Sequence, residues 1–198
     1  MDILLATRNA HKVEEIRQIF APLDFLTLIP ADACPGLPEE VDENADTFEG
    51  NALIKARTLC AASGLWTLSD DSGLEVAALN GAPGIYSARY AGPGCTTADN
   101  NRKLLRELAE VSDRRAQFRC VIALCAPDGR EWTVQGICPG TIARECHVGG
   151  GFGYDPLFIP DGYDRTFAEL DPAEKNRISH RGRALQNAFA AWRDLFTQ

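Results

Sequence analysis

Short apolar runs alternate along this chain with stretches of helical periodicity. The runs have the length of buried β-strands and lie at residues 3–6, 25–29, 65–68, 74–79 and 117–126. A further run at about 130–138 follows the turn residues Asp128 and Gly129, which predicts a β-hairpin. Hairpin strands are antiparallel, whereas strands that alternate with helices tend to pair in parallel. The pattern therefore predicts an α/β protein with a mixed sheet.

Four stretches have the periodicity of amphipathic helices. Each follows a residue or motif that can cap a helix, namely Asn9, the segment 46–49 that resembles a capping box, Thr97 and Ser179. The second helix is expected to end at Gly64. The residues expected on the buried faces are Val13, Ile16, Ile19, Phe20, Phe48, Ala52, Ala56, Leu59, Leu104, Leu105, Leu108, Leu185, Phe189, Trp192 and Phe196.

Polar segments end two of the predicted strands. The strand at 65–68 is expected to stop at the turn-forming residues 69–73. The strand at 74–79 is expected to end in a tight turn at Asn80 and Gly81.

Length and composition describe an ordinary soluble globular chain. Its 198 residues suit one domain, and 45% of them are hydrophobic and 24% charged. No apolar run approaches the roughly 20 residues that cross a bilayer. Residues 1–5 lack the positive segment that opens a secretory signal, so we expect a cytoplasmic protein with no membrane partner.

Charge and cysteine content narrow the class of partner. The net charge of −8 disfavours a protein that grips nucleic acid through its phosphates, but it permits a mononucleotide held by a few lysines and a metal ion. The seven cysteines are an odd number without a C-x-x-C pair, so we expect reduced, mostly buried thiols. The three histidines have no paired Cys/His spacing, which argues against structural zinc.

Polar residues 7–12 follow the first predicted strand and open the first predicted helix. Backbone N–H groups at a helix start attract an anion, and Lys12 adds a full positive charge there. Because a lysine in the first turn opposes the helix dipole, a ligand would explain its position. The alternative is a capped helix with a solvated lysine.

Carboxylates gather at two further places. Asp70 and Asp71 follow the strand predicted at 65–68, where they could hold Mg²⁺ or accept a proton from water. Asp42 and Glu43 precede the helix that carries Lys55. The alternatives are an ordinary turn, a solvated acidic face and a surface lysine.

A glycine-rich segment, 149–156, carries Phe152 and Tyr154. It is not a Walker A loop, since no Gly-Lys-Ser/Thr follows. Glycines that bring the backbone close to a ligand, beside two aromatic rings, suit a base that stacks and hydrogen-bonds. Lys175 and the segment 179–183 add cations that suit an anion or a polarised carbonyl. The alternatives are a loop with two core aromatics and a solvated basic turn.

Six motifs that include these segments follow one another along the chain. They are A-T-x-N-x-x-K-x-x-E at 6–15, T-F-x-x-N-A-x-x-K-A at 47–56, D-D-S-G-L at 70–74, G-A-P-G-I-Y-S-A-R-Y at 81–90, G-G-F-G-Y-D-P at 150–156 and E-K-x-x-I-S-H-R at 174–181. In this order they resemble the inosine triphosphate pyrophosphatase family of non-canonical purine nucleoside triphosphate pyrophosphatases. Arg8 stands where that family often has glycine, and Gly50 where it often has an acid, which leaves Glu43 as the better candidate ligand.

The resemblance implies a fold, a reaction and partners. The fold would be a single domain over 1–198, elongated and two-lobed, with a long twisted mixed sheet and a cleft between the lobes. The enzyme would be a homodimer that uses Mg²⁺ and hydrolyses ITP, dITP or XTP to the monophosphate and pyrophosphate. That reaction would cleanse the nucleotide pool of deaminated purines before they enter DNA or RNA.

The resemblance also implies roles for individual residues. Asp71 would accept the proton of the attacking water and, with Glu43, hold Mg²⁺. The triphosphate would lie against Thr7, Arg8, Asn9, Ala10, His11, Lys12 and Lys55, and Ser72 would also contact the substrate. The base and sugar would lie against Phe152, Gly153, Tyr154, Asp155, Lys175, His180 and Arg181. Selectivity for a 6-keto purine needs hydrogen-bond donors at that edge, and we expect His180, Arg181 and backbone N–H groups to supply them.

Two other interpretations stay open at this stage. A Maf-type nucleotide pyrophosphatase would carry an N-terminal Ser-x-x-Arg-Arg motif, which is absent here. A non-catalytic nucleotide sensor would not need Asp71, Glu43 and Lys12 together. A turnover assay with ITP and magnesium separates a sensor from an enzyme.

Overall fold

The computed structural model describes residues 1–196 and the burial of the side chains up to Leu195. The strands are β1 (Asp2–Leu5), β2 (Thr27–Pro30), β3 (Trp66–Val76), β4 (Arg115–Cys125), β5 (Glu131–Ile142) and β6 (Phe158–Pro160). The α-helices are α1 (Ala10–Phe20), α2 (Phe48–Ser63), α3 (Thr97–Glu107), α4 (Pro172–Ile178) and α5 (His180–Phe196). None of the helices described combines the length and the apolar character needed to cross a membrane.

The strands form one sheet in the order β2-β1-β3-β4-β5-β6. β1 pairs in parallel with β2, where Asp2 faces Thr27, and in parallel with β3, where Ile3 faces Trp66. β6 pairs antiparallel with β5. The predicted α/β class and mixed sheet are therefore confirmed. The chain divides into two compact units, the first made of residues 1–71, 120–136 and those from 181 onward, the second of 72–119 and 137–180.

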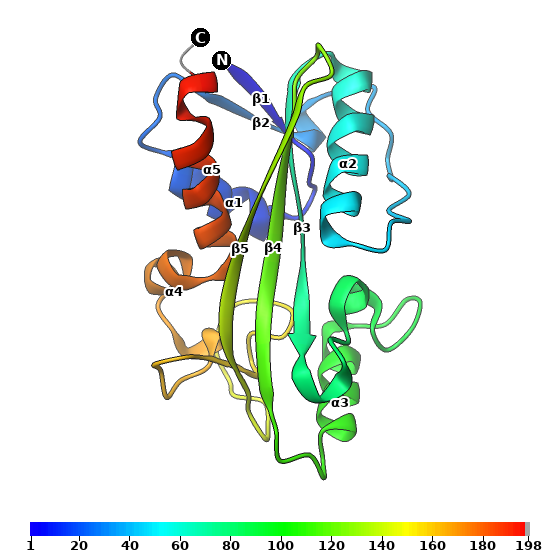
Figure 1. Cartoon of the computed structure of the whole chain (residues 1–198), viewed down its shortest axis with the longest axis vertical. Helices are drawn as coiled ribbons and strands as arrows, with labels where there is room; N and C mark the ends of the chain where they lie inside the picture. Colours follow the sequence, from blue (N-terminus) through cyan, green and yellow to red (C-terminus); the bar gives the residue numbers. More distant parts are fainter. Residues whose placement is uncertain (197–198) are drawn as a thin grey trace. The chain divides into compact units, whose positions relative to one another are not determined.

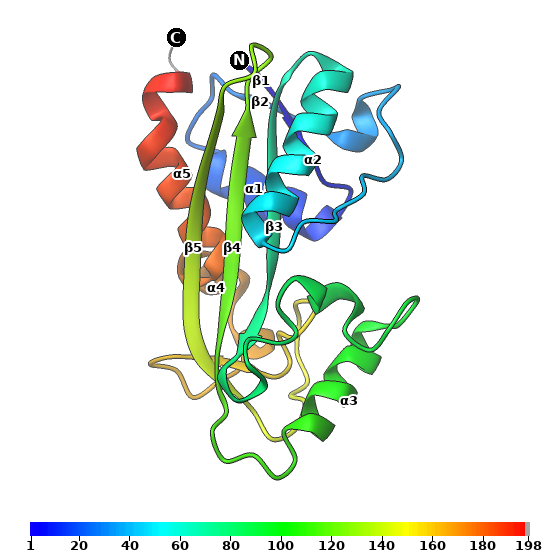
Figure 2. The same ribbon diagram turned by 45° about the vertical axis from the view of Figure 1, so that its right-hand side comes forward.

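In the first unit, β1 is buried on both of its faces. Successive residues of a strand point to opposite sides of a sheet. Ile3 and Leu5 pack with apolar residues of α1 and α5, whereas Leu4 packs with Leu59 of α2. Accordingly, α1 and α5 cover one face of this part of the sheet and α2 covers the other (Figures 1 and 2).

The second unit has a core of its own. Leu104 and Leu108 of α3 pack with Leu74 and Val76 from the end of β3. The aromatic residues of this core are Phe118, Tyr154, Phe158 and Phe167. Burial of such large apolar side chains is the main contribution to the stability of a small domain.

The expected break at 69–73 is wrong, because β3 runs without interruption from Trp66 to Val76. Turn-forming residues are tolerated in a strand when the sheet gives their backbone groups partners. A short 3₁₀ turn, Ala77–Leu79, replaces the end of the strand predicted at 74–79. The tight turn after it is present, with Asn80 at φ 53° and Gly81 at φ 87°.

Two helix caps differ by one residue from the prediction. Thr47 caps α2 by accepting a hydrogen bond from the Gly50 N–H, so the expected capping box at 46–49 does not form. Thr96, rather than Thr97, caps α3 in a capping box with Asp99. Both errors arise because neighbouring polar residues compete for the same free N–H groups of the first turn.

The other predicted ends and buried faces are mostly confirmed. Gly64 ends α2 in the left-handed conformation. Phe189 is an exception, since it is 36% exposed on α5. The short helix α4 and its cap Asp171 were not predicted. The prediction that the Phe196 side chain faces inward lies outside the described side chains.

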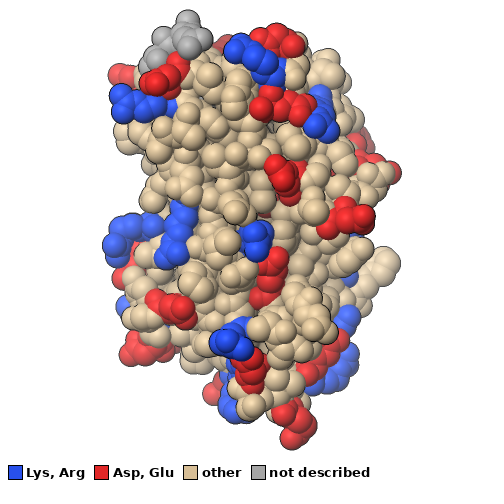
Figure 3. Space-filling view, in the orientation of Figure 1, with Lys and Arg blue, Asp and Glu red and all other residues tan. Residues whose placement is uncertain are grey.

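Acidic and basic side chains lie close together over the face shown in Figure 3. They occur there in small groups of both signs. Ion pairs such as Arg57 with Glu131 and Arg130 with Asp128 bring opposite charges together in the first unit.

Candidate active site

The start of α1 is organised by Asn9, as predicted. Its Oδ1 atom accepts hydrogen bonds from the backbone N–H groups of His11 at 3.0 Å and Lys12 at 3.4 Å. The Thr7 hydroxyl in turn accepts a hydrogen bond from the Asn9 N–H at 3.2 Å. Residues 8–11 are exposed, so this helix start is open to a ligand.

The Arg8 side chain binds protein groups rather than open solvent. Its Nε atom lies 3.2 Å from a carboxylate oxygen of Asp32, and its other two nitrogens donate to the carbonyls of Pro38 and Glu39. Arg8 therefore ties the loop before α1 to segment 32–39. These contacts occupy three of the five N–H donors of a side chain that is 41% exposed, so the triphosphate role predicted for Arg8 stays a prediction.

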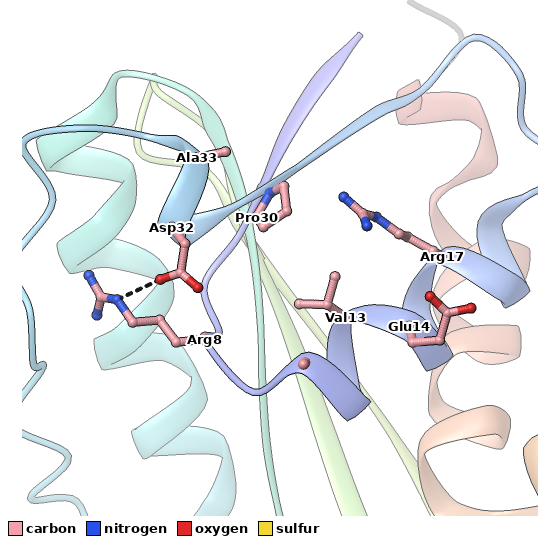
Figure 4. A pocket seen from close by; sticks show the side chains of 8 residues that line it. Arg8, Val13, Glu14, Arg17, Pro30, Asp32 and Ala33 are labelled. Carbon is pink, nitrogen blue, oxygen red and sulfur yellow. Dashed lines mark ion pairs between the residues drawn. The ribbon is translucent and has the colours of Figure 1, made fainter.

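A pocket of about 500 Å³ lies beside the ion pair between Arg8 and Asp32 (Figure 4). It is lined by Arg8, Ala10, Val13, Glu14, Arg17, Pro30, Asp32 and Ala33. Lys12 does not line it. Two of its lining residues, Arg8 and Ala10, belong to the segment predicted to contact the triphosphate.

Asp70 is the centre of a buried ion-pair network. Its Oδ2 atom lies 2.9 Å from Nζ of Lys12 and 3.3 Å from Nε of Arg181, and the Asp70 side chain is 1% exposed. Arg181 also donates to Glu15. Burial alone would raise the pKa of Asp70, but the positive charges of Lys12, Arg181 and Lys55 hold that pKa well below its usual range. Asp70 therefore stays ionised and fixes two of the predicted substrate-binding cations.

Asp71 shares the charges of Lys12 and Lys55 with Asp70 but also has partners of its own. Asn51 donates a hydrogen bond to its carboxylate, and the negative charge of Glu43 acts on it. Burial, helped by the negative charge of Glu43, raises the pKa of Asp71 despite the opposing effect of Lys55. A carboxylate with a raised pKa is a stronger proton acceptor.

Lys55 joins these groups. Its Nζ atom lies 3.0 Å from a carboxylate oxygen of Glu43 and donates to the Asp70 carbonyl at 3.0 Å. The structure thus brings together Glu43, Lys55 and Asp71, three residues that are separate in the sequence.

The carboxylates of this unit suit a metal that keeps most of its ligands as water or phosphate. No group of three or more His, Cys, Asp or Glu residues gathers at metal-binding distance within the described part of the chain. Magnesium is commonly held by only one or two carboxylates together with water and substrate phosphates. Glu43 and Asp71 are close enough for the charge of one to raise the pKa of the other. The two residues therefore fit such an ion.

In the second unit, Asp155 organises the glycine-rich segment. Its Oδ2 atom accepts hydrogen bonds from the Phe152 N–H and from Nζ of Lys175, both at 2.7 Å. The Lys175 ammonium lies 4.8 Å from the centre of the Phe152 ring. Gly151 has φ 82°, and a Cβ atom there would lie 2.2 Å from Asp155 Oδ2. Only glycine fits this close approach.

Most of the predicted base-binding residues are buried, namely Tyr154, Asp155, Lys175, His180 and Arg181. Tyr154 is 4% exposed, and its hydroxyl donates to the Ser87 carbonyl at 2.9 Å. The His180 ring stacks on Phe118 with centroids 4.6 Å apart. Phe152 and Gly153 are half-buried and stay accessible in part, as does Ser72.

Sequence reasoning missed two polar residues of these networks and the partners of a third. Glu15 and Asn51 stand in the quoted motifs but were given no role, whereas Asp70 was considered as a metal ligand or proton acceptor and not as the partner of Lys12 and Arg181. Their burial is a property of the folded chain, and only an unusual position for a polar residue, such as Asn51 among apolar helix positions, could have marked them.

Comparison with known proteins agrees with the order of the motifs. The model of the Ham1 family matches residues 3–191. A protein of Desulforamulus reducens named dITP/XTP pyrophosphatase is 47% identical and aligns over 99% of this chain and 98% of its own length. A protein of the same name from Mycobacterium tuberculosis is 49% identical, over 98% of this chain and 97% of its own.

Solved structures agree as well. A HAM1 protein from Coxiella burnetii has a TM-score of 0.90 and 43% identity, covering 98% of this chain and 99% of that one. The Ham1 protein of Staphylococcus aureus has a TM-score of 0.87 and 39% identity, covering 98% of this chain and 100% of that one. The resemblance drawn from six motifs is thereby confirmed along the length of the chain, and the chain belongs to the Ham1 family.

Proposed function

We propose that this protein hydrolyses non-canonical purine nucleoside triphosphates, with ITP, dITP and XTP as substrates, to the monophosphate and pyrophosphate. One observation supports this most directly. Asp71 lies with Glu43 and Lys55, and burial raises the pKa of its carboxyl group. The chain that carries this group is 47% identical to a relative named dITP/XTP pyrophosphatase. The protein would thus be a hydrolase acting on an acid anhydride.

In the proposed reaction, a water molecule attacks the α-phosphorus of the substrate. Its proton passes to the Asp71 carboxylate, a new bond forms between the water oxygen and phosphorus, and the bond to the bridging oxygen between the α- and β-phosphates breaks. Pyrophosphate leaves with that oxygen. Such a reaction needs an aligned water and charge neutralisation more than covalent catalysis.

Cations of the first unit would meet the triphosphate. The proposed contacts are the backbone and side chains of residues 7–12, with Lys55 nearby. Lys12 is fixed by Asp70 at 2.9 Å, which holds its charge at the start of α1. Glu43 and Asp71 would hold Mg²⁺, which when bound neutralises phosphate charge.

The base and sugar are proposed to contact residues 152–155 together with Lys175, His180 and Arg181. Phe152 offers a partly exposed ring, while Asp155 and Lys175 hold the segment that carries it. The proposed donors to the 6-keto oxygen are His180 and Arg181. A 6-amino purine would leave such a donor unpaired, at a loss of about 1–3 kcal/mol.

We further propose that the enzyme acts in the cytoplasm as a homodimer and removes deaminated purines before polymerases use them.

Product analysis tests the proposal. The protein is incubated with Mg²⁺ and ITP, XTP, dITP, GTP or ATP, and the products are separated by anion exchange, with Asp71→Asn as the control. We expect IMP and pyrophosphate from ITP, and little turnover of ATP or GTP. Formation of IDP and orthophosphate would refute the reaction, and binding of ITP without turnover would favour the sensor.

A further inference from the structure

Asn51 is a buried polar residue on the sheet-facing side of α2. It is the fourth residue of the helix and is 2% exposed, between Phe48 and Ala52 on the buried face. Asparagine is a poor helix former, and burial of its amide is unfavourable unless both ends are hydrogen-bonded. A residue of this type at this position therefore needs a reason other than helix formation or packing.

Both ends of the Asn51 amide have partners. The Oδ1 atom accepts a hydrogen bond from the Ala45 N–H at 2.9 Å. The amino group donates to the Asp71 carboxylate. A backbone N–H can only donate and an ionised carboxylate can only accept, so these two partners define which way the amide points.

The two partners belong to the two segments that carry the proposed metal ligands. Asp71 lies on β3, and Ala45 lies two residues after Glu43 in the segment that leads into α2. A single neutral side chain thus connects the backbone near one carboxylate to the other carboxylate itself.

Gly50 shows that this segment is seated tightly on the helix. A Cβ atom at position 50 would lie 2.6 Å from Cβ of Ala45 and 3.1 Å from Oγ1 of Thr47. A side chain at position 50 would therefore push Ala45 and its segment away from Asn51. The glycine at this position is therefore explained by close packing, and it supports the same contact that Asn51 makes.

We propose that Asn51 is a positioning residue that holds the Asp71 carboxylate and the Glu43 segment in register, so that both carboxylates can bind one divalent cation. The inference rests on the roles proposed above for Asp71 and Glu43. Asparagine suits this task because it donates to one partner and accepts from the other without adding charge. Aspartate would place a third negative group at the site, and leucine would make neither hydrogen bond.

The test compares Asn51→Leu and Asn51→Asp with the unchanged protein. Binding of Mn²⁺, used as a probe in place of Mg²⁺, is measured by electron paramagnetic resonance without nucleotide, and kcat and KM are measured with ITP. Loss of a residue that orients metal ligands typically lowers metal affinity or activity by about 10- to 100-fold. We expect Asn51→Leu to weaken Mn²⁺ binding and to lower kcat in that range, with a smaller change in KM. Asn51→Asp keeps the Ala45 hydrogen bond, and we expect it to lower kcat about as far.

Asn100 provides the matched control. It is also a buried asparagine on a helix, with Oδ1 accepting from the Ala91 N–H at 2.7 Å and Nδ2 donating to the Ala88 carbonyl at 3.1 Å. Asn100→Leu should lower the melting temperature, as Asn51→Leu does, but leave Mn²⁺ affinity and the kcat of folded protein within about twofold.

Each outcome decides the inference. It is overturned if both Asn51 variants bind Mn²⁺ and turn over ITP like the unchanged protein, or if Asn100→Leu shows the same losses. Should Asn51→Leu not fold, Asn51→Asp decides alone. If the unchanged protein binds Mn²⁺ but does not release pyrophosphate from ITP, the proposed function fails while the metal measurements still test Asn51.

Discussion

Replacing Asp70 by asparagine is the sharpest test of the charge network beneath the proposed phosphate site. The change keeps the shape of the side chain and removes its charge. Asp70 and Arg181 are 1% and 3% exposed in their side chains, and Lys12 is 17% exposed. The variant would leave two cations facing a neutral amide inside the protein.

The expected loss of stability depends on which partners Lys12 and Arg181 keep in the variant. Removing one partner of a buried ion pair costs about 3–5 kcal/mol, because the other charge stays buried and unpaired. Arg181 keeps its bond to Glu15, and Lys12 can turn partly to solvent. We therefore expect Asp70→Asn to lower the free energy of unfolding by about 3 kcal/mol, the lower end of that range.

Urea unfolding followed by tryptophan fluorescence measures this loss. Trp66, Trp132 and Trp192 all belong to the unit that contains Asp70, and the first two are stacked with ring centroids 5.6 Å apart. Asp128→Asn is the control, because Asp128 forms an exposed ion pair with Arg130. Such pairs contribute about 0–1 kcal/mol. A loss for Asp70→Asn no larger than that of the control would refute the reasoning.

The difference in unfolding free energy between the unchanged protein and Asp70→Asn should depend on pH in one direction. Because the pKa of Asp70 is held below its usual range in the folded protein, its carboxylate stabilises the fold fully at pH values above the ordinary aspartate pKa of about 3.9. That contribution is lost as the pH falls below this value toward the lowered pKa. The gap between the unchanged protein and Asp70→Asn should therefore narrow on acidification, and a gap that widened would mean that Asp70 is not ionised.

Three further predictions follow from the candidate site. Asp71→Asn should remove nearly all turnover with ITP but leave urea unfolding almost unchanged; a variant that keeps more than about a tenth of the rate has lost under roughly 1.4 kcal/mol and would exclude Asp71 as base or main ligand. Arg181→Lys keeps a cation for Asp70 and Glu15 but loses the planar fork, so kcat/KM should fall more for ITP than for ATP, whereas an equal fall would assign Arg181 to the charge network alone. All seven cysteines should be free thiols, with Cys60, Cys120, Cys125 and Cys138 buried; alkylation of unreduced, denatured protein should add seven labels by mass, and a lower count would indicate a disulfide.

The sequence by itself determined the features that depend on neighbours along the chain. Asn9 caps α1 because its side chain reaches N–H groups two and three residues ahead. Gly64 ends α2 because the left-handed conformation there favours glycine. The period of apolar residues gave the α/β class, and the order of six motifs identified the family.

Only the tertiary structure decided which polar groups meet. The turn expected at 69–73 is strand, because hydrogen bonds within the sheet outweigh the local preference of Asp, Ser and Gly for turns. As a result Asp70 meets Lys12 and Arg181, while Asp71 meets Asn51. The partners of Asp70 lie more than 50 residues before it and more than 100 residues after it in the sequence. A local sequence pattern carries no information about contacts between residues so far apart in the chain. Burial, and with it the opposite shifts in the pKa of two adjacent aspartates, exists only once the sheet and its covering helices have assembled.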